Sequence, residues 1–147
     1  MKPTLLIAGL MTALFVLGCA SGPHSKPELV DAKYYEIDQT KTIHTGDKIV
    51  SAALQIGKTT KNGKTSYQPM PETTMTELIY MGLEDGKIMI LKRYYKYDDN
   101  NGKPKLSLTD TATRTHNPED KYYQCQNIRI EIIEATEQTL TFKVISD

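Results

Sequence analysis

Alternating polarity runs through most of the chain after residue 33, and this feature limits the fold more than any other. In the two clearest runs, apolar side chains occupy every second position: Ile128, Ile130 and Ile132, then Leu140, Phe142 and Val144. A period of two gives a strand one buried and one solvated face, the pattern of antiparallel sheets. No window of about 11 residues shows the i, i+3, i+4, i+7 apolar spacing of a helix. We therefore predict an all-β fold, a small antiparallel sandwich or barrel of about seven or eight strands.

Turn residues divide these runs into hairpins. Asn62-Gly63 and Asp85-Gly86 supply residues that tolerate the positive φ angles of a tight hairpin turn. The second pair joins the runs 77–82 and 87–97, which we expect at the centre of a sheet.

The first 18 residues have the organisation of an export signal. Lys2 precedes an apolar run of 13 residues, from Leu5 to Leu17. This run is shorter than the roughly 20 apolar residues that a membrane-spanning helix needs. We therefore expect the segment to direct export and to be removed from the mature protein.

The residues that end this segment, Val16-Leu17-Gly18-Cys19, resemble the lipobox of bacterial lipoproteins. The resemblance implies a diacylglycerol thioether on Cys19, cleavage after Gly18 and a further acyl chain, such as palmitate, on the new amino group. Two or three acyl chains hold a protein stably on a membrane, whereas one does not. The residue after the cysteine is Ala20 and not Asp. In Gram-negative lipoproteins, this choice implies transport to the outer membrane, with the domain facing the periplasm or the cell surface. The alternative is an ordinary signal peptide with an incidental cysteine.

Composition divides the chain into three parts. Residues 1–18 are the expected signal peptide, and residues 19–32 are the expected lipidated N-terminus and flexible tether, because they are rich in Ser, Gly and Pro. Residues 33–147 should then form a single β domain.

Two stretches of this domain resemble a C-terminal β module of uncharacterised exported bacterial lipoproteins. The first contains Glu77 to Gly82, Asp85 to Ile88 and Arg93-Tyr94-Tyr95, and the second is Ile128 to Thr136 followed by a final strand. Tyr95 stands where the module often has an acidic residue. The resemblance covers about half of the mature chain and implies a β fold and export, with no activity attached.

Eighteen basic residues balance 18 acidic ones, which gives a formal net charge of zero. Nucleic-acid binders and polybasic membrane-surface proteins depend on an excess of positive charge. We therefore expect no nucleic-acid partner, and we expect membrane contact only through the acyl chains on Cys19.

The sequence carries no catalytic or metal-binding motif. His24, His44 and His116 lack partners at metal-ligand spacing, and Asp98 to Gly102 lacks the alternating acidic spacing of a calcium loop. Neither the Gly-x-Ser-x-Gly nor the Ser-x-x-Lys pattern of a nucleophilic serine occurs. We expect a protein that is not an enzyme and holds no metal or cofactor.

Cys125 is the only other cysteine, which excludes a disulfide framework once Cys19 carries lipid. We expect Cys125 to be buried and reduced. A disulfide to another molecule is the alternative.

Tyrosine is the least ordinary part of the composition, because nine tyrosines accompany two phenylalanines and no tryptophan. Several are adjacent in the chain, and adjacent residues of a strand point to opposite faces. Each doublet should therefore turn one ring outward, and tyrosine is common at protein interfaces. Our candidate binding face consists of Tyr34, Tyr95, Tyr97 and Tyr123. Alternatively, these rings only cover cross-strand neighbours.

Together these observations favour a lipid-anchored envelope protein that acts by binding or as a structural accessory of an envelope assembly, with a protein partner. The alternative is an inhibitor or immunity-type protein that blocks a hydrolase with a protruding loop. The longest irregular stretch, Arg114 to Asp120, would supply that loop, with Arg114 or His116 pointing outward.

Overall fold

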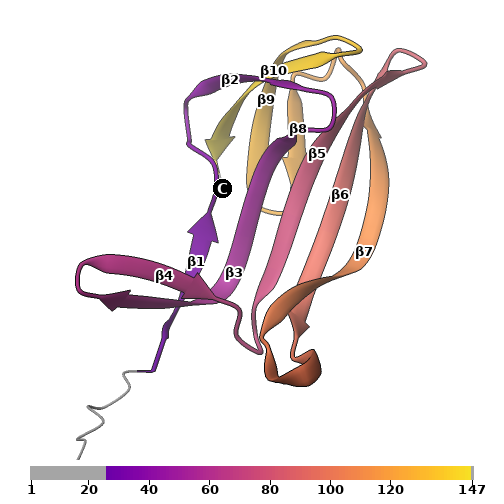
Figure 1. Cartoon of the computed structure of the whole chain (residues 1–147). Coiled ribbons are helices and arrows are strands. Elements are labelled where there is room, and N and C mark those ends of the chain that lie inside the picture. Colours follow the sequence, from indigo (N-terminus) through magenta and orange to yellow (C-terminus); the bar gives the residue numbers. More distant parts are fainter. Residues whose placement is uncertain (1–25, 147) are drawn as a thin grey trace, which may run out of the picture.

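Ten β-strands form the framework of residues 26–146, the part of the chain that the computed structural model describes (Figure 1). The strands are β1 Glu28–Lys33, β2 Thr40–His44, β3 Lys48–Lys61, β4 Lys64–Gln68, β5 Thr74–Glu84, β6 Lys87–Asp98, β7 Lys105–His116, β8 Tyr122–Cys125, β9 Ile128–Ala135 and β10 Thr139–Ser146. A short 3₁₀ turn, η1 (Asn100–Gly102), lies between β6 and β7. No α-helix occurs among these residues, so the all-β prediction is confirmed. The lipobox, with Cys19, lies outside the described residues.

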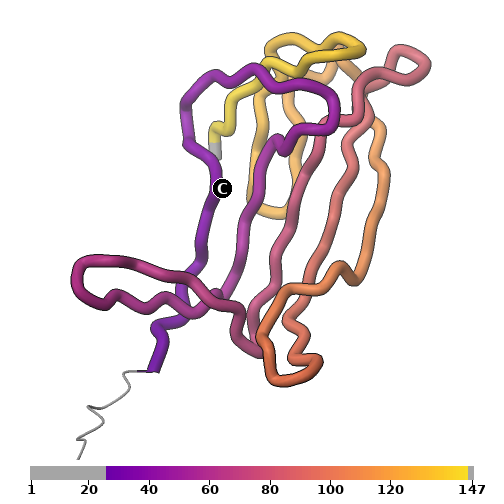
Figure 2. Tube along the Cα trace, in the orientation of Figure 1, coloured from indigo at the N-terminus to yellow at the C-terminus, as the bar shows by residue number. Residues whose placement is uncertain are grey.

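The strands form two antiparallel sheets that pack as a sandwich. The large sheet has the order β1-β3-β5-β6-β7, with β4 pairing with part of β3, and the small sheet has the order β2-β10-β9-β8. Figure 2 shows the chain crossing from the large sheet to the small one for β2, returning for β3 to β7, and ending in the small sheet. The end of β10 lies beside the β1–β2 connection, where Ile37 and Val144 form an isolated bridge.

The hydrophobic core lies between the two sheets. Leu78, Tyr80, Ile88 and Ile90 of the large sheet are at most 1% exposed. The small sheet contributes the residues predicted from their alternation, all at most 7% exposed: Ile130, Ile132, Leu140, Phe142 and Val144. The prediction that the last hairpin closes the core is therefore confirmed. Cys125 belongs to the same cluster, is 8% exposed and is not in a disulfide.

One end of the sandwich is held together by contacts between β5 and the β9–β10 turn. The hydroxyl of the buried Tyr80 donates a hydrogen bond to the carbonyl oxygen of Thr136. Two residues further along, Gly82 has a φ of 95°, and a Cβ atom there would lie 2.8 Å from the carbonyl oxygen of Glu137. Glycine is required here because no side chain fits between β5 and this turn.

The two predicted hairpin turns are present. Asn62 and Gly63 have φ angles of 52° and 74°, and Asp85 and Gly86 have φ angles of 49° and 72°. Positive φ at both central residues is the requirement of a type I′ turn. The Asp85-Gly86 turn joins β5 to β6, and β5 lies at the centre of the large sheet.

The fold has more strands than predicted because β1, β2 and the short β8 carry little sequence signal. β1 lies almost entirely within residues 19–32, which we expected to be a tether, so the β domain begins before residue 33. It is held by its ladder with β3 and by Val30 and Ala32, which pack near Ala53 and Ile56. Local composition cannot show this, because the stabilising contacts lie far away in the sequence.

The expected long loop at Arg114 to Asp120 is also shorter than predicted. β7 continues to His116 and pairs with β6 along this length, with Ile88 opposite His116 and Ile90 opposite Arg114. Both candidate loop residues therefore lie in a strand. The backbone ladder with β6 extends the strand beyond the point where the threonine-rich sequence loses apolar alternation.

Candidate binding face

The large sheet carries aromatic and aliphatic side chains on the face that points away from the small sheet. We call this the tyrosine face: Tyr34, Met75, Tyr95, Tyr97, Leu106 and Leu108. The register places Tyr95 between Met75 of β5 and Leu108 of β7, and Tyr97 opposite Leu106. Tyr34 and Leu108 are 53% and 50% exposed, so large apolar side chains of this face are open to solvent. Large exposed apolar patches are a common feature of interaction surfaces.

A hollow of about 410 Å³ opens on the tyrosine face. Its lining includes Ile56 from β3, Met75 from β5, Leu106 from β7, and Tyr34, which directly follows β1. β1 and β7 are opposite edges of the sheet, so a hollow that joins Tyr34, just after β1, to Leu106 of β7 shows that the sheet curls on this side. A β-bulge between Tyr94 and Tyr95 bends the β6–β7 pair, and Figure 1 shows β7 turning sharply in its lower part.

Alternation along β6, and along the extended segment that directly follows β1, explains which ring of two tyrosine doublets reaches this face. Tyr34 turns outward, while Tyr35 packs against the core between the sheets. Tyr95 likewise turns outward, while Tyr94 lines a separate hollow with Lys92, Asp110 and Arg114. The structure therefore brings together three of the four tyrosines that we selected from the sequence.

Tyr123, the fourth candidate, is not part of the tyrosine face. It lies opposite Ile130 on β9, packs against the core and makes an edge contact with His116, with ring centroids 5.4 Å apart. Its neighbour Tyr122 is the outward ring, 42% exposed, and the Arg129 guanidinium lies 4.2 Å above it. We selected the wrong member of this doublet because the register of β8 against β9 is not visible in the sequence.

A buried carboxylate supports the centre of the tyrosine face. Glu77 of β5 is 3% exposed and accepts a hydrogen bond from the Tyr95 hydroxyl over 2.8 Å. It also forms an ion pair with Lys48. Burial alone raises the pKa of Glu77, but the hydrogen bonds from Lys48 and Tyr95 and the charges of Lys48 and Arg93 outweigh it and hold the pKa below 4.5. Glu77 is therefore ionised at neutral pH and fixes the Tyr95 ring in place.

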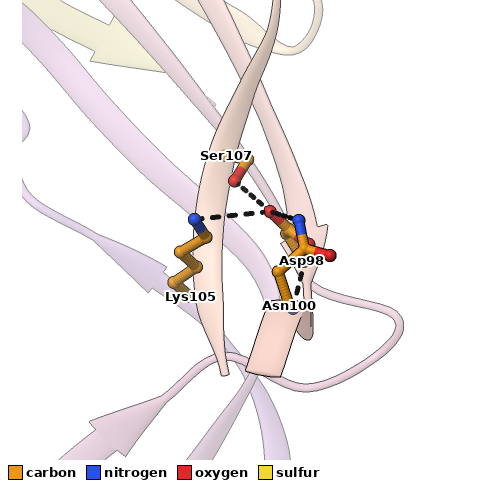
Figure 3. A network of polar contacts seen from close by, with 4 residues as sticks. All are labelled: Asp98, Asn100, Lys105 and Ser107. Atoms are coloured by element: carbon orange, nitrogen blue, oxygen red, sulfur yellow. Dashed lines mark hydrogen bonds and ion pairs between the residues drawn. The ribbon is translucent and has the colours of Figure 1, made fainter. Parts of the chain in front are cut away.

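A second polar network fixes the end of the β6–β7 hairpin (Figure 3). Oδ2 of Asp98 accepts hydrogen bonds from Ser107 Oγ at 2.6 Å and Asn100 Nδ2 at 3.1 Å, and Lys105 Nζ lies 3.6 Å away. The hydrogen bond from Ser107 is the main reason that the pKa of Asp98 is lowered. The network holds together the segment that carries Tyr97 and Leu106 to the tyrosine face.

Sequence reasoning did not select Met75, Glu77, Leu106 or Leu108 as site residues. The only available signal for these residues was the spacing of Leu106 and Leu108, two positions apart. This spacing indicates that both side chains lie on the same face of a strand, but it does not show which face of the sheet that is. Glu77 gave no signal, because its burial depends on Lys48 and Tyr95 from two neighbouring strands.

Arg114 and His116 do not form a protruding site. Nε2 of His116 lies 2.7 Å from the carbonyl oxygen of Asp120, which folds the short β7–β8 connection back on the strand. Arg114 borders a hollow of about 310 Å³ on the opposite side of the large sheet from the tyrosine face, together with Lys92, Tyr94 and Gln126.

Within residues 26–146, no group of three or more His, Cys, Asp or Glu side chains could hold a metal ion. The same stretch contains no helix of the length and apolar character needed to cross a membrane. Comparison of the chain with protein-family models, with curated proteins and with solved structures found no match.

Proposed function

We propose that this chain is a lipid-anchored protein of the bacterial cell envelope that binds a protein partner through the tyrosine face. In this proposal Cys19 carries the acyl chains that hold the protein on the outer membrane, and the β domain acts by binding, not by catalysis. The membrane and the partner are the two contacts that define its role.

The observation that supports this proposal is the grouping of Tyr34, Tyr95 and Tyr97 on one face of the large sheet, where Tyr34 lines a hollow and Tyr95 and Tyr97 lie opposite its lining residues Met75 and Leu106. Rings that serve only as cover for cross-strand neighbours would be shielded, whereas Tyr34 is about half exposed. Interfaces favour large, rigid side chains of this type, with aliphatic neighbours that exclude water. The inhibitor alternative has no comparable support, because Arg114 and His116 lie in β7.

The membrane part of the proposal is tested by Cys19→Ser. This substitution should release the protein from the membrane fraction or leave an unprocessed precursor, and it should abolish labelling with an alkyne analogue of palmitate. Cys125→Ser is the matched control and should leave both processing and labelling intact. Normal processing and membrane partition of Cys19→Ser would contradict lipid anchoring.

The binding part is tested by photo-cross-linking in the bacterium that encodes the chain. A photoreactive phenylalanine analogue at Tyr34 should give a cross-linked product of defined mass, and Leu108→Asp in the same chain should remove it. The same analogue at Tyr122 is the control, because Tyr122 is a comparably exposed tyrosine on the small sheet. Equal products from both positions, or a product insensitive to Leu108→Asp, would rule out the tyrosine face as the contact surface.

A further inference from the structure

β7 forms an open edge of the large sheet. It pairs with β6 from Lys105 to His116, interrupted by a bulge at Thr109, and no strand within residues 26–146 pairs with its other side. Thr109 to Arg114 are exposed except for Ala112, which is partly buried. An edge of this length presents a row of backbone donors and acceptors that can pair with another strand.

The other edges of the two sheets lack this combination of length and composition. β2 and β8 have five and four residues, and β1 has six. β4 has five residues and is followed by Pro69, which cannot donate to a ladder. Beyond the bulge at Thr109, the seven residues of β7 from Asp110 to His116 contain no lysine and no proline, the residues with which proteins commonly protect an edge.

The side chains of β7 are arranged symmetrically around Ala112. Asp110 lies two residues before it and Arg114 two residues after it, while Thr111 and Thr113 flank it directly. If two antiparallel copies of β7 meet at Ala112, each Asp110 lies opposite Arg114 of the second copy. Each Thr111 then lies opposite Thr113 of the second copy. Opposite charges and threonine pairs are both favourable across an antiparallel ladder.

We propose that β7 is a homodimer interface, in which two copies pair antiparallel in the register centred on Ala112 and join their large sheets into one. Asp110 and Arg114 are available for these contacts, since neither forms an ion pair with another residue of the described part of the chain. A two-fold axis through Ala112 makes the interface self-complementary and closed, so pairing stops at two copies. This interface lies at the sheet edge and is independent of the proposed binding role of the tyrosine face.

Charge reversal tests the register. Asp110→Arg places two positive charges opposite each other at both ends of the pairing, and Arg114→Asp places two negative charges there. Each single variant should dimerise about tenfold or more weakly than the unmodified chain. The double variant restores opposite charges and should dimerise like the unmodified chain. An equimolar mixture of the two single variants should form a mixed dimer, because their charges are complementary.

Sedimentation velocity of the full chain in a density-matched detergent measures these equilibria over a dilution series. Glu134→Arg is the control for a general charge effect, since Glu134 is an exposed residue of β9 in the small sheet. Equal melting temperatures at a dilution at which every chain is monomeric would show that the substitutions affect only association. An unmodified chain that is monomeric throughout the series, or single variants that dimerise as it does, would overturn the proposal.

A disulfide provides a second measurement in the membrane itself. Ala112→Cys places two thiols at the two-fold axis, where Cα atoms of directly paired strands are about 4.5–5.5 Å apart, within the range of a disulfide. Mild oxidation should give a reducible dimer. The unmodified chain, with its own Cys125 buried, and Thr109→Cys, which lies away from the axis, should give little. Equal cross-linking of Thr109→Cys would contradict the register centred on Ala112.

Discussion

The hydroxyl of Tyr95 donates a hydrogen bond to the buried carboxylate of Glu77 over 2.8 Å, so one ring of the tyrosine face is fixed by a charge beneath it. The two residues lie on neighbouring strands, β5 and β6, in diagonal positions of the ladder. Lys48, from β3 on the other side, neutralises the same carboxylate. Three strands are thus joined by one polar cluster on the tyrosine face.

Removal of this hydrogen bond should destabilise the protein. Tyr95→Phe deletes one donor to a buried, ionised group, and hydrogen bonds to charged groups are worth about 1.5–3 kcal/mol. We expect a loss of this size in the free energy of unfolding, measured by urea denaturation. Tyr34→Phe is the matched control on the same face and should change the free energy by less than about 0.5 kcal/mol. Equal effects of the two variants would show that the Glu77 contact contributes nothing specific.

The contribution of Glu77 should also depend on pH. Its pKa is lowered in the folded protein, so the carboxylate stabilises the fold fully at pH above its unfolded-state pKa, near 4.5. That stabilisation is lost as the pH falls through the lower pKa of the folded state. Glu77→Gln should therefore be less stable than the unmodified chain at neutral pH, and the difference should shrink below about pH 4.5.

Urea denaturation of both chains at several pH values measures this difference directly. Asp98 and Glu131 also have lowered pKa values, but they are common to both chains and cancel in the comparison. A stability difference that stays constant between neutral and acidic pH would contradict the assignment.

The contact between Gly82 and the β9–β10 turn predicts a large effect for a single methyl group. Gly82→Ala places a Cβ atom 2.8 Å from the carbonyl oxygen of Glu137, in a backbone conformation with φ of 95°. Gly86→Ala is the matched control, because its φ is also positive, at 72°, but nothing lies within 4 Å of its Cβ position. Strain of a positive φ costs about 1–2 kcal/mol, and overpacking adds about 1–3 kcal/mol. Gly82→Ala should lower the melting temperature clearly more than Gly86→Ala, and equal shifts would contradict this packing.

The core prediction is tested at Phe142 of β10. Phe142 is 2% exposed between the sheets, and Phe142→Ala should cost about 3–5 kcal/mol of stability. Ile133→Ala is the control, since Ile133 on the neighbouring β9 is 51% exposed. A chain that loses less stability with Phe142→Ala than with Ile133→Ala would show that this hairpin does not close the core.

The sequence was informative wherever a local pattern decides the structure. The alternation around Ile130 and Phe142 predicts both the strands and their buried face, and Asp85-Gly86 predicts a hairpin turn. β1 was missed because its stability comes from a ladder with β3, whose paired residues are 19 to 30 positions away in the sequence. The tyrosine doublets show the same limit: alternation predicts one outward ring in each, but only the strand register decides between Tyr122 and Tyr123. The burial of Glu77 could not be predicted for the same reason. It depends on contacts with Lys48 and Tyr95, which lie on two other strands.

The network around Asp98 should control how firmly the tyrosine face is held. Asp98→Ala removes the acceptor for Ser107 and Asn100 at the end of the β6–β7 hairpin, which carries Tyr97 and Leu106. The hairpin keeps its backbone ladder, so we expect the fold to remain, while amide hydrogen exchange between residues 98 and 108 becomes faster. Hydrogen exchange followed by mass spectrometry measures this locally, and peptides from β9 and β10 should exchange as before. Glu84→Ala, at the opposite end of the sheet, is the control and should leave the β6–β7 hairpin unchanged.

If the tyrosine face binds a partner, Asp98→Ala should also weaken the cross-link from Tyr34, because Leu106 lines the same hollow. Unchanged exchange of residues 98–108 in Asp98→Ala would show that the network does not hold the hairpin.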